Sequence, residues 1–145
     1  MVKAFSYRSI VPGKSTREAE YPLPSVARET STPIVYLRDP KSLAAEAYRT
    51  IRTGLLLSQA GEPPRTILVS SAQSSEGKTT SSINLAACLA SAGGRVVLID
   101  ADLRRPSVNK HFGIRSGTPG LVDILTGYAR PHEVAIPNVA PGLTL

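Results

Sequence analysis

A loop of small and polar residues at positions 71–80 constrains this chain more than any other feature, because of the segments that it joins. The preceding run, Thr66–Ser70, is short, apolar and β-branched, which is typical of a strand buried on both faces of a parallel sheet. Residues 78–92 are apolar nearly all round, which predicts a buried helix. Residues 95–100 form a second apolar run. Strand, helix and strand within about thirty-five residues predict a βαβ unit and therefore an α/β fold with a parallel sheet.

The loop itself has the spacing of a phosphate-binding P-loop. It matches Gly-x-x-x-x-Gly-Lys-[Ser/Thr] at every defined position except the first, where Ala72 replaces glycine. The backbone amides of such a loop converge on phosphate oxygens, and the helix behind it adds about half a positive charge. We expect Lys78 to reach the β- and γ-phosphates and the Thr79 hydroxyl to ligate Mg²⁺. The predicted site for Mg·ATP comprises Ala72, Gln73, Ser74, Ser75, Glu76, Gly77, Lys78, Thr79 and Thr80.

Two carboxylates follow the second predicted strand, at Asp100 and Asp102. Ligands of open α/β sheets lie beyond the carboxyl ends of the strands, so these side chains should emerge beside the phosphate loop. They can orient the waters of a magnesium ion or accept a proton from an attacking hydroxyl. In a purely structural alternative, Asp102 caps the following turn and the neighbouring Arg104 and Arg105 are solvated.

The rest of the chain divides at about residue 40. Prolines interrupt residues 1–40, which predicts a flexible tail or linker, with a short strand or docking segment at residues 34–37. Residues 41–145 are expected to form one partial domain.

That domain should begin with a helix capped by Ser42. An apolar stripe on this helix is predicted from Leu43, Ala47, Ile51 and Leu55. A short helix is expected within residues 120–127, and the start of a third strand at residues 142–145.

Composition excludes several other kinds of site. The one cysteine, Cys88, rules out an internal disulfide framework and a cysteine-based zinc site, and we expect it to be buried. The net charge is +6, but the basic residues are scattered, so no nucleic-acid partner is expected. The sequence has no secretory signal and no run near the roughly 20 apolar residues of a membrane span, which predicts a cytoplasmic protein.

The two polar motifs, with alanine at position 72, resemble those of the bacterial tyrosine kinases of capsule and exopolysaccharide synthesis. Residues 72–79 are similar to the Walker A motif of these autokinases, and residues 97–106 to their Walker A′ motif. Two further segments agree with the resemblance: a Glu-x-x-Arg-x-x-Arg motif at Glu46, Arg49 and Arg52, and residues 120–127.

The resemblance implies a P-loop NTPase fold in which helices flank a parallel sheet in three αβα layers. It implies that Lys78 and Thr79 hold ATP and magnesium, and that Asp100, assisted by Asp102, acts on the metal or as the base that activates a tyrosine hydroxyl. Glu46, Arg49 and Arg52 would mediate ring-like self-association, although Glu46 and Arg49 also have the spacing of a local helix ion pair. A transmembrane chain-length protein would be the activator and would hold the kinase at the inner face of the membrane.

The resemblance also places two elements after Leu145: the Walker B strand with its metal-binding aspartate, and a tyrosine-rich tail. We therefore expect residues 1–145 alone to bind nucleotide poorly and to transfer little phosphate. Two other functions remain open. A Min/Par-type partition ATPase shares the fold but usually has a signature lysine where this chain has Gln73. A nucleotide-binding interaction protein without kinase activity is the third possibility.

Overall fold

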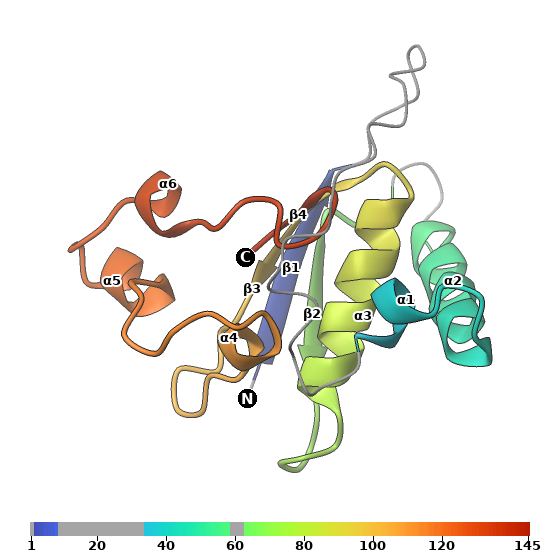
Figure 1. The fold of residues 1–145 in the computed structure, drawn as a ribbon, viewed down its shortest axis with the longest axis horizontal. Helices are drawn as coiled ribbons and strands as arrows, with labels where there is room; N and C mark the ends of the chain where they lie inside the picture. Colours follow the sequence, from blue (N-terminus) through green and yellow to red (C-terminus); the bar gives the residue numbers. More distant parts are fainter. Residues whose placement is uncertain (1, 9–33, 59–62) are drawn as a thin grey trace.

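The computed structural model describes residues 2–8, 34–58 and 63–145, and the side chains of residues 34–58 and 63–145. Within these residues four strands form one sheet in the order β2-β1-β3-β4 (Figure 1). The strands are β1 (Val2–Arg8), β2 (Thr66–Ser70), β3 (Arg95–Ile99) and β4 (Leu143–Thr144). Strands β3 and β4 are parallel, whereas β1 is antiparallel to both of its neighbours.

The sheet differs from the predicted parallel one in its second position. Strands β2 and β3 run in the same direction, as a βαβ unit requires, but they do not pair with each other. Strand β1 lies between them, with Phe5 opposite Ile67 on one side and Leu98 on the other. The crossover leaves room for one strand, and β1 supplies partners for backbone groups on the inner edges of β2 and β3.

The segment predicted as a tail also contains structure. It includes strand β1 and helix α1 (Val35–Arg38), whereas residues 9–33 lie outside the described residues. Residues 34–37 were expected to form either a short strand or a docking segment. Helix α1 stands in place of the strand, and it docks on the rest of the protein. Its Tyr36 is buried, and the Tyr36 hydroxyl lies 2.8 Å from Ser91 Oγ at the end of α3. The division of the chain into a tail and a domain remains a prediction.

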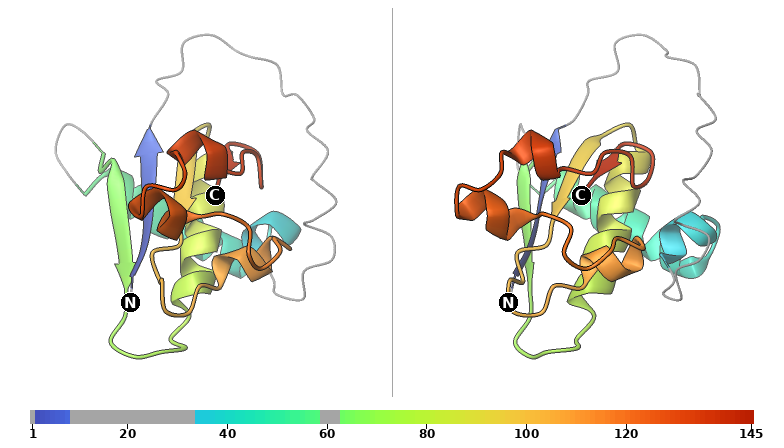
Figure 2. Two further views of the ribbon diagram at one scale, coloured as in Figure 1. Left: turned by 90° about the vertical axis from the view of Figure 1, so that its left-hand side faces the viewer. Right: turned by 60° about the vertical axis from the view of Figure 1, so that its left-hand side comes forward.

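Helix α3 (Lys78–Ser91) forms the centre of the molecule. One side packs on the sheet and the other on α1 and α2 (Leu43–Leu56), which explains why its sequence is apolar nearly all round (Figures 1 and 2). The predicted buried helix is therefore confirmed, and Cys88 on it is buried and unbridged. The core between α3 and the sheet contains Ile83, Ala86, Leu89, Ala90, Val96, Leu98 and Leu143.

Helix α2 starts as predicted, because Ser42 Oγ accepts a hydrogen bond from the Ala45 amide at 3.2 Å. Three of the four residues of the predicted apolar stripe are exposed, and Leu55 packs against the core. Leu43 is 92% exposed and Ile51 48% exposed. The helix instead turns Ala45, which is fully buried, toward the rest of the protein, with Tyr48 packed at the edge of the core. Small Ala45 permits close approach to α3, which a leucine at the same place would prevent.

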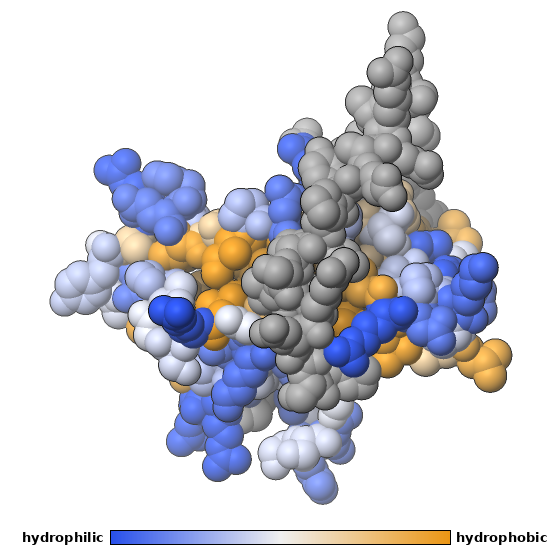
Figure 3. Space-filling view, in the orientation of Figure 1, coloured by the Kyte–Doolittle hydropathy of each residue, from blue (hydrophilic) through white to orange (hydrophobic). Residues whose placement is uncertain are grey.

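Three short helices follow β3: α4 (Val108–His111), α5 (Leu121–Leu125) and α6 (Pro131–Val134). Helices α5 and α6 lie on the side of the sheet away from α3 (Figure 1), whereas α4 begins beside Thr79 of α3. The predicted helix within residues 120–127 corresponds to α5, and the predicted third strand to β4. Apolar residues gather between these helices and the sheet (Figure 3), where they line a cavity of about 840 Å³. None of the described helices is long and apolar enough to cross a membrane.

Candidate nucleotide-binding site

The loop between β2 and α3 has the backbone that a phosphate cradle requires. Gly77, the N-cap of α3, has φ +85° and Ser75 has φ 65°, so two alternate residues adopt the left-handed conformation. A side chain at position 77 would meet only Ser81 Oγ, at 4.0 Å, so the backbone angle rather than crowding demands glycine there. Residues 72–77 are exposed, which leaves the loop accessible to a ligand.

The Lys78 ammonium is folded back onto this loop. The side chain is only 9% exposed, and Nζ donates hydrogen bonds to Ser71 Oγ at 2.5 Å and to the Gln73 carbonyl at 3.1 Å. Ser71 Oγ donates in turn to the same carbonyl at 2.8 Å. Ser71 was not among the predicted site residues. The sequence signal for it was a hydroxyl residue immediately before the motif.

One of the loop amides donates its hydrogen bond to a carboxylate of the same loop. The Gln73 N–H donates to Glu76 Oε2 at 2.9 Å. This hydrogen bond is the largest of the effects that lower the pKa of Glu76, followed by the Ser71 hydroxyl; the charge of Lys78 adds to them. Glu76 therefore stands where an anion is favoured, which is the property expected of a phosphate site.

Thr79 and Thr80 begin helix α3 beyond the loop. Thr79 Oγ1 lies 2.8 Å from Ser107 Oγ, on the segment that follows β3. The Thr80 carbonyl accepts a hydrogen bond from Asn84 Nδ2 at 2.8 Å, within the helix. Of the two threonines, Thr79 is the one whose hydroxyl contacts the segment of the second motif.

Asp100 anchors the segment after β3. Its Oδ1 accepts a hydrogen bond from the Asp102 amide at 3.1 Å, and its Oδ2 accepts from the amides of Ser107 and Val108 at 2.9 and 3.0 Å. Val108 is the first residue of α4, so this carboxylate also caps that helix. The sequence predicted the place of Asp100 at the carboxyl edge of the sheet but not this structural function.

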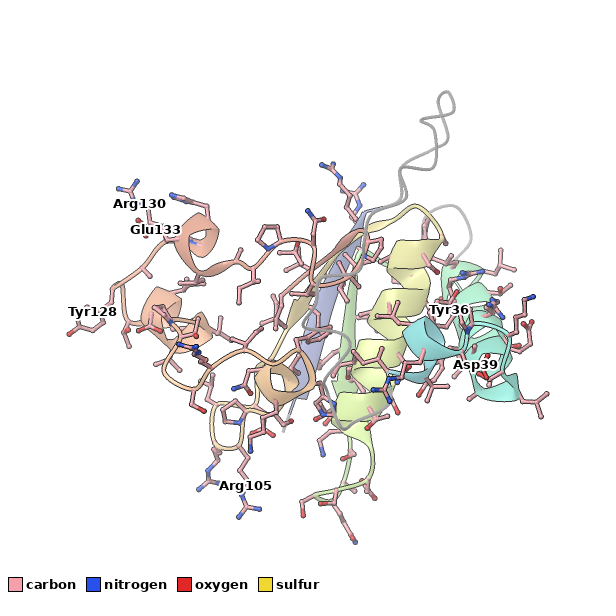
Figure 4. All side chains as sticks on the ribbon, in the orientation of Figure 1. Tyr36, Asp39, Arg105, Tyr128, Arg130 and Glu133 are labelled. Atoms are coloured by element: carbon pink, nitrogen blue, oxygen red, sulfur yellow. The ribbon has the colours of Figure 1, made fainter. Side chains whose placement is uncertain are left out.

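Asp102 has the turn-capping contact that was the structural alternative. It is 6% exposed, and its Oδ1 accepts a hydrogen bond from the Arg105 amide at 3.0 Å. Arg104 and Arg105 are both exposed, and Figure 4 shows Arg105 extending away from the sheet.

The two motifs meet at one end of the sheet, where the loop before α3 lies beside the segment between β3 and α4 (Figures 1 and 2). Thr79 is joined to Asp100 through Ser107. No group of three or more His, Cys, Asp or Glu side chains within the described residues could hold a metal ion by itself. This arrangement fits Mg²⁺, which is typically held by one or two protein groups together with phosphate oxygens and water.

The residues predicted for self-association have partners within the chain. Arg49 Nη1 lies 2.7 Å from Glu46 Oε2, Arg49 Nη2 donates to the Pro40 carbonyl, and the guanidinium lies 5.4 Å from the centre of the Tyr36 ring. The bond to Glu46 is the main reason that the pKa of Arg49 is raised. Arg52 Nη1 donates to the Cys88 carbonyl at 3.2 Å.

Comparison with known families places this site in context. Residues 67–119, which span both motifs, match the CobQ/CobB/MinD/ParA nucleotide-binding domain. No solved structure gives a significant match.

The chain is also similar to several curated proteins. The tyrosine-protein kinase YwqD of Bacillus subtilis is 40% identical over 92 residues, which cover 63% of this chain and 38% of the relative. The tyrosine-protein kinase ptk of Acinetobacter johnsonii is 31% identical over 118 residues, which cover 81% of this chain and 16% of the relative. The tyrosine-protein kinase wzc of Salmonella typhi is 28% identical over 132 residues, which cover 91% of this chain and 18% of the relative.

The aligned part of this chain thus spans well under half the length of each of these three relatives. Their names agree with the motifs, and the matched nucleotide-binding domain agrees with the α/β fold. The resemblance to the bacterial tyrosine kinases of capsule and exopolysaccharide synthesis is therefore confirmed, on an α/β fold of the P-loop NTPase type.

Proposed function

We propose that this chain is the nucleotide-binding part of a protein-tyrosine autokinase that regulates capsule or exopolysaccharide synthesis and chain length. The observation that carries the proposal is the meeting of the P-loop with the carboxylates after β3, in a chain whose relatives are named tyrosine-protein kinases. The reaction transfers the γ-phosphoryl group of Mg·ATP to a tyrosine hydroxyl.

Each predicted residue has a distinct task in this proposal. The amides of residues 72–77 surround the phosphates, and Lys78 leaves Ser71 and the Gln73 carbonyl to neutralise them. Magnesium supplies positive charge that stabilises the transferring phosphoryl group. Thr79 would hold the metal through its hydroxyl, and Asp100 and Asp102 would orient its waters or accept the proton of the tyrosine.

The test is Lys78→Met in the full-length protein, incubated with ATP and Mg²⁺ and probed for phosphotyrosine. Loss of a charge-assisted hydrogen bond should weaken nucleotide binding about ten- to a hundredfold and abolish labelling. Lys41→Met, which changes an exposed lysine outside the loop, is the matched control. Normal labelling of Lys78→Met would remove Lys78 from the mechanism.

The matched domain also includes MinD and ParA, which keeps a partition-type ATPase as a second candidate. Such a protein would hydrolyse ATP without producing phosphotyrosine in itself or in its partners. A protein with neither activity, but with nucleotide affinity, would be an interaction protein. The same incubation separates the three functions if released phosphate is measured alongside phosphotyrosine.

Self-association through α2 is part of the proposal. The exposed Leu43 and Ile51 leave an apolar surface on the helix that carries Glu46, Arg49 and Arg52. A second copy could cover that surface. We further propose that a transmembrane chain-length protein activates the kinase and holds it at the inner face of the membrane.

A further inference from the structure

Ser107 lies in space between the two motifs, and it is not among the site residues predicted from the sequence. Its hydroxyl lies 2.8 Å from Thr79 Oγ1, and its backbone N–H donates to Asp100 Oδ2 at 2.9 Å. It is therefore the residue through which the predicted magnesium ligand of α3 contacts the carboxylate after β3.

The position of Ser107 in the fold makes its hydroxyl contact unusual. Ser107 is the N-cap of α4, a place where serine normally accepts a hydrogen bond from an amide of the first turn. Its side chain makes no such bond here. Asp100 accepts the Val108 amide instead, at 3.0 Å, so the Ser107 hydroxyl is left to face Thr79.

We propose that Ser107 is a positioning residue for magnesium, which holds the Thr79 hydroxyl in the orientation of a metal ligand. A hydroxyl has one proton and two lone pairs. When a lone pair of Thr79 faces a cation, the proton must point elsewhere, and Ser107 Oγ is an acceptor at hydrogen-bond distance. The contact also fixes the side-chain rotamer of Thr79, which would otherwise be free to turn its oxygen away.

The anchor of Ser107 is independent of its own side chain. Because the bond to Asp100 uses the backbone N–H, an alanine at position 107 keeps that bond and loses only the contact with Thr79. Ser107→Ala thus separates the positioning of Thr79 from the folding of the loop.

The test is calorimetric titration of ADP into the full-length protein, once with Mg²⁺ and once with EDTA. Loss of one orienting hydrogen bond should reduce the gain in ADP affinity that Mg²⁺ provides by about three- to tenfold in Ser107→Ala. Affinity in EDTA should not change. Ser107→Thr should restore the gain, and Ser116→Ala, an exposed serine after α4, should behave like the wild type.

A double-mutant cycle with Thr79→Ala completes the test. If Ser107 acts through Thr79, its replacement should have no further effect once the threonine hydroxyl is gone. An undiminished magnesium gain in Ser107→Ala, additive losses in the double variant, or an equal loss in EDTA would overturn the inference. A wild-type protein without any magnesium gain would instead contradict the nucleotide site on which the inference rests.

Discussion

Replacing Asp100 by alanine tests whether this residue has a structural function besides any catalytic one. The carboxylate accepts hydrogen bonds from the amides of Asp102, Ser107 and Val108. A hydrogen bond contributes about 1 kcal/mol net where water can replace a partner. The loop is partly exposed, so Asp100→Ala should lower the free energy of unfolding by about 3 kcal/mol.

Asp102→Ala is the matched control, because among the described residues the Asp102 carboxylate accepts one backbone hydrogen bond, from Arg105. Its loss should cost about 1 kcal/mol. Asp100→Asn is a useful intermediate: the amide oxygen can still accept on one side, but the amide nitrogen then faces N–H donors. We therefore expect the order of stability wild type, Asp102→Ala, Asp100→Asn, Asp100→Ala.

Urea unfolding of the nucleotide-free protein, followed by far-ultraviolet circular dichroism, measures these differences. With a slope of about 1.5 kcal/mol per molar urea, a loss of 3 kcal/mol lowers the midpoint by about 2 M. The slope itself should stay constant. If Asp100→Ala unfolds no earlier than Asp102→Ala, the three amide contacts do not stabilise the loop, and the structural function assigned to Asp100 is wrong.

Three other predictions follow from contacts outside that carboxylate. Because the pKa of Glu76 is lowered, its hydrogen bond to the Gln73 amide should persist at neutral pH and be lost as the pH falls through that lowered pKa. The NMR chemical shift of the Gln73 amide proton should follow this change, with a midpoint below the ordinary glutamate pKa. Glu76→Gln removes a negative charge beside the phosphates and should raise ADP affinity about two- to fivefold at low salt, as titration calorimetry would reveal. Gly142→Ala should lower the free energy of unfolding by about 2 kcal/mol, because φ is +72° and a Cβ would lie 2.9 Å from the Gly94 carbonyl oxygen. Gly54→Ala in α2, where a Cβ would meet nothing within 4 Å, should raise the free energy of unfolding by about 0.5–1 kcal/mol in the same assay.

The parts of the fold that the sequence predicted well are those with strong local signals. Helix α3 is apolar nearly all round because it lies between a sheet and two helices, and Gly77 has the backbone angle that its motif requires. The cap at Ser42 followed from side-chain chemistry within four residues. In each case the determining contacts lie close in the chain or act on the whole surface of one element.

The features that sequence patterns did not reveal depended on choices between distant partners. Periodicity identified a stripe on α2 at Leu43 and Ile51, but it could not show that the small Ala45 would face α3 instead. Residues 2–8 contain no proline, yet the prolines after them led to the prediction of a tail. Their strand exists in a gap between β2 and β3, and only the arrangement of the sheet reveals that gap.

The site repeats this division between local and distant information, and it affects how variants should be interpreted. Asp100 can be assigned to the carboxyl edge from its sequence alone, but its partners are amides two, seven and eight residues later, which depend on how the loop folds back. One of these partners, Ser107, also contacts Thr79. Loss of phosphotyrosine in an Asp100 variant would therefore combine three effects: a missing base or metal contact, a loosened loop, and a displaced Thr79 hydroxyl. Only Ser107→Ala, which keeps the carboxylate and the backbone bond, isolates the third effect from the other two.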